Sequence, residues 1–178
     1  MPRLHLLLPL ALILAACEGP GHDDTLTYQV YLGSGDVTGT TINEDIHVDP
    51  NESYWRNFLA QAQSTLGKAP TRFDINDVRI QLAVPKSRNV SMIQDVFSEE
   101  VTVFLRAQDS GTQVDIARLE EPKGSAQVSL KTTGNDLERL RSNLLASDFR
   151  LGLRGTTPKQ ASSDFDAVIT VTLDVTAR

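Results

Sequence analysis

One group of residues has types and spacing that suit metal binding: Asp45, His47 and Asp49. In an extended segment, side chains two positions apart project from the same face, so these three would offer carboxylate and imidazole ligands together. A divalent cation is therefore a candidate cofactor, and the sequence indicates no other. The alternative is structural: Ile46 and Val48 face the core, the polar residues face water, and Asp49 caps a helix.

The sequence lacks the residues and motifs that a hydrolase with a nucleophilic triad needs. Beyond the N-terminal apolar segment the only histidines are His22 and His47, and the patterns Gly-x-Ser-x-Gly and Ser-x-x-Lys are absent. A carboxylate pair can hydrolyse sugars, but no motif selects a pair among the 23 acidic residues. We therefore expect a protein that is not an enzyme.

Three aromatic residues fall outside the apolar faces of their segments: Tyr31, Tyr54 and Phe104. Exposed rings of this kind stack on sugars, so the three are candidates for a carbohydrate-binding platform. The alternative is that they are ordinary surface residues, because single exposed apolar side chains are common on soluble proteins.

The N-terminus has the composition of an export signal. Arg3 precedes an apolar run over residues 6–16, and small residues come just before the polar stretch that begins at Glu18. The run is shorter than the roughly 20 residues that a membrane-spanning helix needs. The pattern therefore predicts a cleaved signal peptide over residues 1–16.

The residues Leu14-Ala15-Ala16-Cys17 resemble the lipobox of bacterial lipoproteins, and Cys17 is the only cysteine in the chain. The resemblance implies that Cys17 becomes the first residue of the mature protein and carries acyl chains, including palmitate. Several acyl chains give stable membrane attachment, whereas one alone binds marginally. Glu18 after the cysteine implies sorting to the outer membrane, with the periplasmic and the surface-exposed side both left open.

Composition indicates one domain behind this anchor. Residues 17–25 contain two glycines, a proline and mostly polar groups, which predicts a flexible tether, and residues 26–178 suit a single domain. The net charge is −6, and it becomes −7 when Arg3 leaves with the signal. An acidic surface disfavours nucleic acid and anionic lipid headgroups as partners.

Alternating apolar and polar residues predict about eight or nine strands. Two helices are expected, over residues 49–66 and 135–146, together with a short helical turn at residues 91–97. The last alternating run, over residues 165–175, is expected at or near the centre of its sheet. Turn signals at short intervals and no βαβ rhythm favour a mainly β fold, an antiparallel β-sandwich with two helices. A lipocalin-like barrel is the alternative.

The sequence therefore predicts a lipid-anchored protein of the cell envelope, non-catalytic, with a structural or protein-binding role and an envelope protein as a partner. The alternative is a module of the same fold and anchor that binds a carbohydrate or a divalent metal.

Overall fold

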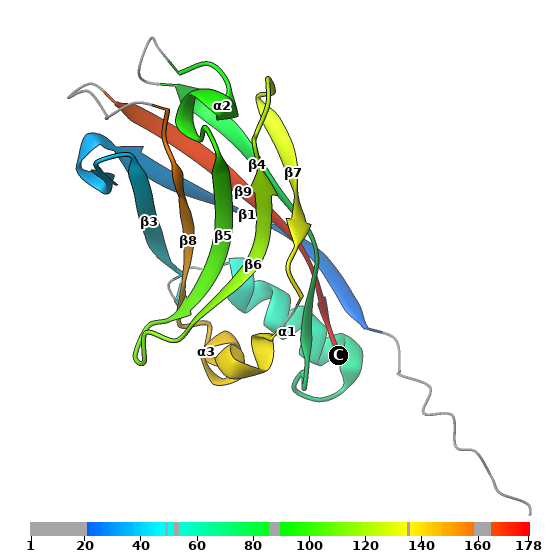
Figure 1. Ribbon diagram of the computed structural model, residues 1–178. Helices are drawn as coiled ribbons and strands as arrows, with labels where there is room; N and C mark the ends of the chain where they lie inside the picture. The colour runs from blue at the N-terminus through cyan, green and yellow to red at the C-terminus, as the bar shows by residue number, and fades with distance from the viewer. Residues whose placement is uncertain (1–20, 49, 52–53, 86–89, 135, 159–164) are drawn as a thin grey trace, which may run out of the picture.

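The computed structural model describes residues 21–48, 50–51, 54–85, 90–134, 136–158 and 165–178. These residues form a mainly β domain in which nine strands make one antiparallel sheet (Figure 1). The expected antiparallel, mainly β class and the expected number of strands are confirmed. The strands are β1 (His22–Gly33), β2 (Val37–Thr38), β3 (Thr41–Val48), β4 (Phe73–Pro85), β5 (Glu100–Ala107), β6 (Gln113–Glu120), β7 (Gln127–Thr132), β8 (Phe149–Thr156) and β9 (Asp166–Ala177).

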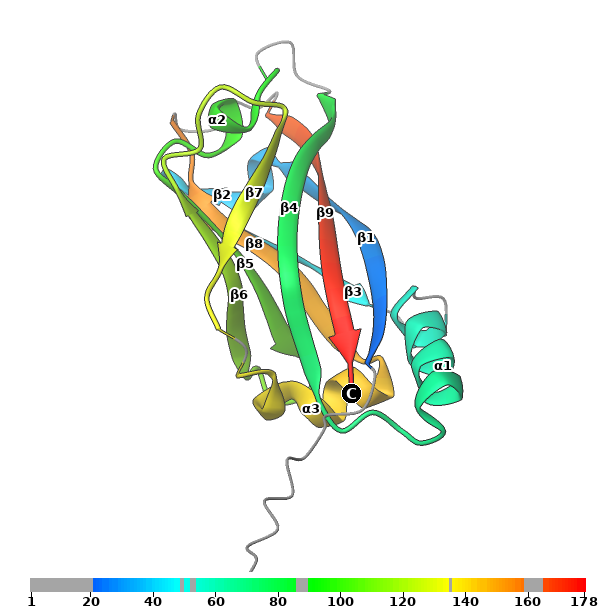
Figure 2. The same ribbon diagram turned by 90° about the vertical axis from the view of Figure 1, so that its right-hand side faces the viewer.

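The sheet curls so that its two halves face each other, as Figure 2 shows. The strand order is β1-β9-β4-β7-β6-β5-β8-β3-β2. β7 joins the two halves, because it pairs with β4 on one side and with β6 on the other. The two layers of the expected sandwich are thus continuous at β7. The edge strands β1 and β2 do not pair with each other in the sheet, so it remains an open half-barrel rather than a closed lipocalin-like barrel.

Short helices fill the connections: η1 (Ser34–Asp36), α1 (Tyr54–Leu66), α2 (Ile93–Val96), η2 (Leu137–Leu140) and α3 (Arg141–Ala146). α1 confirms the first expected helix from Tyr54 onward, while its predicted cap, Asp49, lies outside the described residues. The second expected helix is divided into the 3-10 turn η2 and α3, because Leu140 leaves helical geometry with φ −108° and ψ 3°. No helix in the described ranges is long and apolar enough to span a membrane.

The core lies between the two halves of the sheet. The inward residues of β1 are buried, as their alternation predicts: Leu26, Tyr28, Val30 and Leu32. α1 contributes Trp55 and Phe58, which are fully buried. The Trp55 ring lies 5.1 Å from Phe149 and 5.6 Å from Phe73 between ring centroids, and its Nε1 donates a 2.8 Å hydrogen bond to the Leu144 carbonyl. The aromatic stripe of α1 is therefore a packing face that joins both halves of the sheet to α3.

Both ends of the described chain lie at one end of the domain. β1 begins at His22, so the expectation that the tether extends to residue 25 and that folding starts near Leu26 is wrong. His22 pairs with Ala177 of β9, and its Nδ1 lies 3.3 Å from Thr65 Oγ1 at the end of α1. Pairing with β9 thus extends β1 through residues whose polar composition alone predicts a loop.

Candidate functional site

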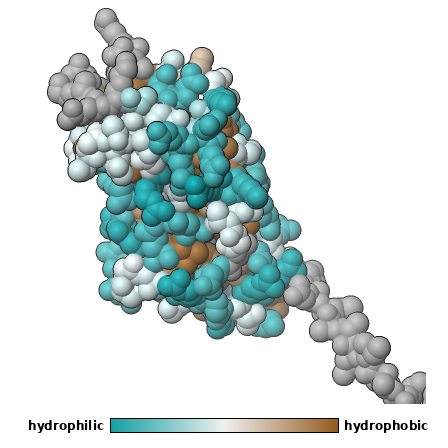
Figure 3. All heavy atoms as spheres, in the orientation of Figure 1, coloured by the Kyte–Doolittle hydropathy of each residue, from teal (hydrophilic) through white to brown (hydrophobic). Residues whose placement is uncertain are grey.

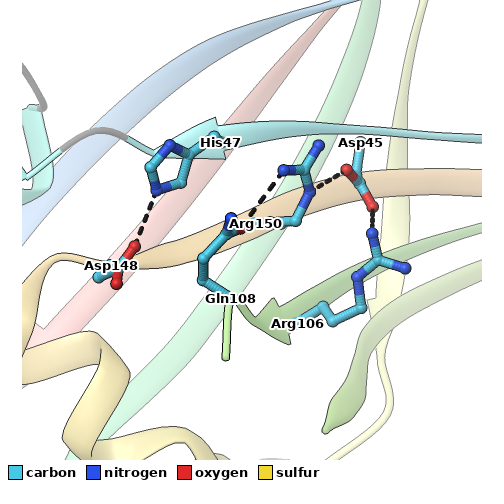
Figure 4. A network of polar contacts seen from close by, with 6 residues as sticks. All are labelled: Asp45, His47, Arg106, Gln108, Asp148 and Arg150. Carbon is cyan, nitrogen blue, oxygen red and sulfur yellow. Dashed lines mark hydrogen bonds and ion pairs between the residues drawn. The ribbon is translucent and has the colours of Figure 1, made fainter. Parts of the chain in front are cut away.

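The polar residues singled out in β3 lie on the outer face of the sheet, where they meet arginines from two neighbouring strands (Figure 4). Strand order places β8 beside β3 and β5 beside β8, with His47 opposite Arg150 and Arg150 opposite Arg106. Asp45 accepts hydrogen bonds from Arg106 Nη2 and Arg150 Nε, one guanidinium at each carboxylate oxygen. Its side chain is 10% exposed. Asp45 is therefore a nearly buried carboxylate neutralised from both sides.

His47 has a partner of its own at the edge of this network. Its Nε2 lies 2.8 Å from Asp148 Oδ1, and both side chains are about 40% exposed, at 39% and 41%. Arg150 also donates from Nη1 to Gln108 Oε1 at 3.3 Å, which extends the network to the end of β5 (Figure 4). The network thus links β3, β5, β8 and the residues that flank them, and it ties down the register of three strands.

The predicted metal ligands do not form a metal site in the described part of the chain. Asp45 directs both oxygens to arginines and His47 directs Nε2 to Asp148, so the two side chains do not share a vacant coordination point. Asp49 lies outside the described residues. Within the described ranges, no three His, Cys, Asp or Glu side chains are grouped as metal ligands would be. This geometry favours the structural alternative for Asp45 and His47.

Phe104 is fully buried, so the expectation that it is an exposed ring is wrong. It lies opposite Gly152 across β5 and β8, and Gly152 lies opposite Asp45 across β8 and β3. A Cβ atom at Gly152 would be 2.2 Å from Phe104 Cζ and 2.8 Å from the Asp45 Cβ. The ring therefore lies over the glycine on the outer face. Phe104 is also absent from the cluster of core residues. Because the Phe104 ring covers the cross-strand glycine and is fully buried, it cannot stack on a ligand.

The two remaining candidates of the platform are exposed but do not act together. Tyr31 is 56% exposed near the end of β1, and Tyr54 is 65% exposed at the start of α1. The ring of Tyr54 contacts Tyr28, which faces inward, at 6.5 Å between centroids. Tyr31 faces outward on the same strand. The three predicted rings therefore belong to three different surfaces, and the structure does not assemble them into a single platform.

A polar hollow lies beside the network, on the outer face of β5, β6 and β8. Its lining includes Arg118, Arg154, Asp115 and Glu100. Arg154 Nη2 lies 2.9 Å from Asp115 Oδ2, and Arg118 Nη2 lies 2.7 Å from Glu100 Oε2. Because each of these cations is matched by a carboxylate, the hollow does not concentrate charge of one sign. The same face appears mostly hydrophilic in Figure 3, with only small hydrophobic areas.

Two groups outside the network have raised pKa values: Glu44 of β3, close to η1, and Tyr28, which faces inward on β1. Burial raises the pKa of Glu44 above its ordinary value of 4.5, and the neighbouring Asp36 carboxylate raises it further. Asp36 is itself held in place, because its Oδ2 accepts a 2.6 Å hydrogen bond from the Gly33 backbone. Burial also raises the pKa of the Tyr28 hydroxyl. Neither group has a histidine, cysteine or serine beside it that would make a catalytic set, among the contacts found in the described residues.

Sequence reasoning identified Asp45 and His47 but missed their partners. Arg106 and Arg150 lie at outward positions of strands with alternating polar and apolar residues, as Asp45 does. This alternation was the only feature of the sequence that could have indicated a common face. Their meeting depends on the order β3-β8-β5, which local patterns do not contain. Cys17, the predicted lipidation site, lies outside the described residues.

Comparison with known proteins adds no family. No family model matches the chain, and no curated protein matches it. One solved structure that it resembles is titled "Desmodium yellow mottle tymovirus", with 8% identity over 99% of this chain and 92% of that chain, and a TM-score of 0.30. At this TM-score the likeness carries no argument about fold or function.

Proposed function

We propose that this protein is a lipid-anchored, non-catalytic component of the bacterial cell envelope, with a structural or protein-binding role. The observation that carries the proposal is the sequence Leu14-Ala15-Ala16-Cys17 at the end of a short apolar run, with the only cysteine of the chain at the position that is acylated in bacterial lipoproteins. An outer-membrane location is part of the proposal, because Glu18 follows that cysteine.

The non-catalytic part of the proposal is supported by how the polar side chains are used. Both carboxylate oxygens of Asp45 accept hydrogen bonds from guanidinium groups, so this side chain is already occupied by partners within the sheet. The one histidine–carboxylate pair of the network, His47 and Asp148, is a surface contact. A general base needs a nucleophile or a water molecule to activate, and a pocket that excludes bulk solvent. The polar hollow on this face is open, so it does not provide such a pocket.

Replacement of the cysteine tests the anchor. Wild-type protein should take up radioactive palmitate and sediment with membranes until detergent is added, whereas Cys17→Ser should take up no label and leave the membrane fraction. Lys68→Ser is the matched control, because it introduces the same residue, serine, at an exposed position, and it should behave as wild type. Wild-type protein that is soluble and unlabelled would refute the anchor.

The binding class is tested by stability. A ligand that binds only the folded state raises the free energy of unfolding by about 2.7 kcal/mol at a hundred times its dissociation constant. We expect no change in the melting temperature with calcium, zinc or glycan fragments. A reproducible rise with any of them would favour a ligand-binding module over a structural or protein-binding role.

A further inference from the structure

The position at which β1 begins limits how the domain can be placed on a membrane. β1 starts at His22, so very little chain separates it from Cys17. A fully extended chain covers at most about 3.6 Å per residue, which puts His22 within about 18 Å of the lipidated residue. This argument rests on the proposed lipid anchor and extends it.

The elements around His22 define one end of the domain, which we call the anchor end. His22 pairs with Ala177, and the Arg178 carbonyl accepts hydrogen bonds from Thr71 and Arg72 in the segment between α1 and β4. Figures 1 and 2 place the C-terminus, α3 and the end of α1 together at this end of the sheet. Lys68, in the segment that follows α1, is exposed here.

The opposite end of the domain, the distal end, is formed by η1, α2 and the segment between β6 and β7. The Gly124 backbone donates a 2.7 Å hydrogen bond to Gln94 Oε1, which holds this segment against α2. Lys123 lies in the same segment with its side chain 80% exposed. β1 runs from one end to the other with 12 residues, a length of about 40 Å at 3.3 Å per residue. The distal end is therefore much farther from the anchor than the anchor end is.

We propose that the anchor end faces the phospholipid headgroup layer and that the strands run away from the membrane, which places η1, α2 and the β6–β7 segment farthest from the lipid. The outer face of β1 and β9 offers no extended apolar surface as a competing attachment. It carries mainly threonine, glutamine and aspartate side chains, and the exposed Tyr31, opposite Val168, lies near the distal end. The net charge, −7 after Arg3 leaves with the signal, does not attract the domain to anionic lipid. The short connection then sets the orientation.

Fluorescent probes at matched lysines test this orientation. Lys68→Cys and Lys123→Cys each introduce one reactive thiol, because the thiol of Cys17 is blocked by the lipid. The full-length lipoprotein is labelled and reconstituted into phosphatidylcholine vesicles that contain a lipid with a nitroxide on its headgroup. We expect the nitroxide lipid to quench more than half of the fluorescence of the probe at position 68. The probe at position 123 should fluoresce as strongly as it does in vesicles without the nitroxide lipid. Gln29→Cys and Asn43→Cys, exposed positions on the two halves of the sheet, should be quenched less than position 68.

The outcomes separate the orientation from the anchor. Protein that stays in the supernatant, with a reactive Cys17, refutes the anchor and the orientation with it. Protein that sediments with vesicles but is quenched equally at positions 68 and 123 refutes the orientation alone. Quenching at position 29 or 43 as strong as that at 68 means that the domain lies on a face of its sheet, and it also overturns the proposal.

Discussion

Substitution of Gly152 by alanine probes the aromatic contact on the outer face of the sheet. The added Cβ would lie 2.2 Å from Phe104 Cζ and 2.6 Å from Cε2, distances that real Cβ atoms do not reach. The backbone of Gly152 is not in the left-handed region, so the effect is steric rather than conformational. The ring must therefore leave its buried position, and we expect Gly152→Ala to destabilise the domain by about 2–3 kcal/mol.

The double-mutant cycle isolates this contact. Phe104→Ala alone should cost about 3 kcal/mol, at the lower end of the range for core phenylalanines, because the ring lies outside the core cluster. Of the three atoms nearest to the added Cβ, only the Asp45 Cβ at 2.8 Å remains in that background, and the loss of a flexible glycine from the unfolded chain partly offsets this contact. The second substitution should then cost less than about 1 kcal/mol, so the two effects are strongly non-additive.

Urea unfolding followed by tryptophan fluorescence measures all four proteins, because Trp55 is the only tryptophan and is fully buried. Gly35→Ala is the matched control: nothing lies within 4 Å of the position of its Cβ, and its free energy of unfolding should change by less than about 0.5 kcal/mol. If the costs of Gly152→Ala and Phe104→Ala simply add, the ring does not depend on the glycine and the reasoning fails.

Three further substitutions test the polar interior and the outer network. Asp45→Asn leaves two adjacent guanidinium groups without their shared carboxylate, and we expect a loss of about 1–3 kcal/mol in the free energy of unfolding, less than for a fully buried pair; no loss in urea unfolding would contradict the role assigned to it. Burial and Asp36 raise the pKa of Glu44 above 4.5 in the folded state, so the folded protein binds this proton more tightly and loses stability as the pH rises from 4.5 through the raised pKa. Glu44→Gln should therefore be more stable than wild type at pH 7, and melting experiments should show that this difference in stability disappears below about pH 4. A variant less stable than wild type at pH 7 would show that the negative charge of Glu44 stabilises the fold. Trp55→Phe removes the donor to the buried Leu144 carbonyl and should cost about 1–3 kcal/mol, measured by circular dichroism, and an unchanged melting temperature would mean that the bond contributes nothing.

The strands could be predicted from the sequence because burial follows a period of two along them. Leu26, Tyr28, Val30 and Leu32 alternate with polar residues and are buried, and the expected final strand is β9. β9 has β1 and β4 on its two sides, so it is an interior strand, one position from the edge rather than central. The two-residue strand β2 was not predicted, since it is too short to show a period.

The candidate site was predicted only in part, because its contacts join strands that are distant in the sequence. Asp45 and Arg150 are 105 positions apart, and they meet through the pairing of β3 with β8. Phe104 shows the same limit: its parity along β5 correctly places it outward, but its burial depends on the glycine across the strand. Local patterns predict the face on which a side chain lies, whereas its neighbours depend on the order and register of the strands.

The pairing of β1 with β9 has a consequence for the order in which the chain can fold as it is synthesised. All 12 residues of β1 pair with β9, and among the strands that the structure describes β9 alone lies beside β1 in the sheet. Thr25 and Asp174, which form a hydrogen bond across this pair, are 149 positions apart. β1 is synthesised first and β9 last, so β1 waits for its partner, and closing so long a loop makes folding slow. During this interval the backbone of β1 and its apolar residues are available to chaperones or to other chains, so crowding around the emerging chain should affect this protein more than one whose first strands pair locally.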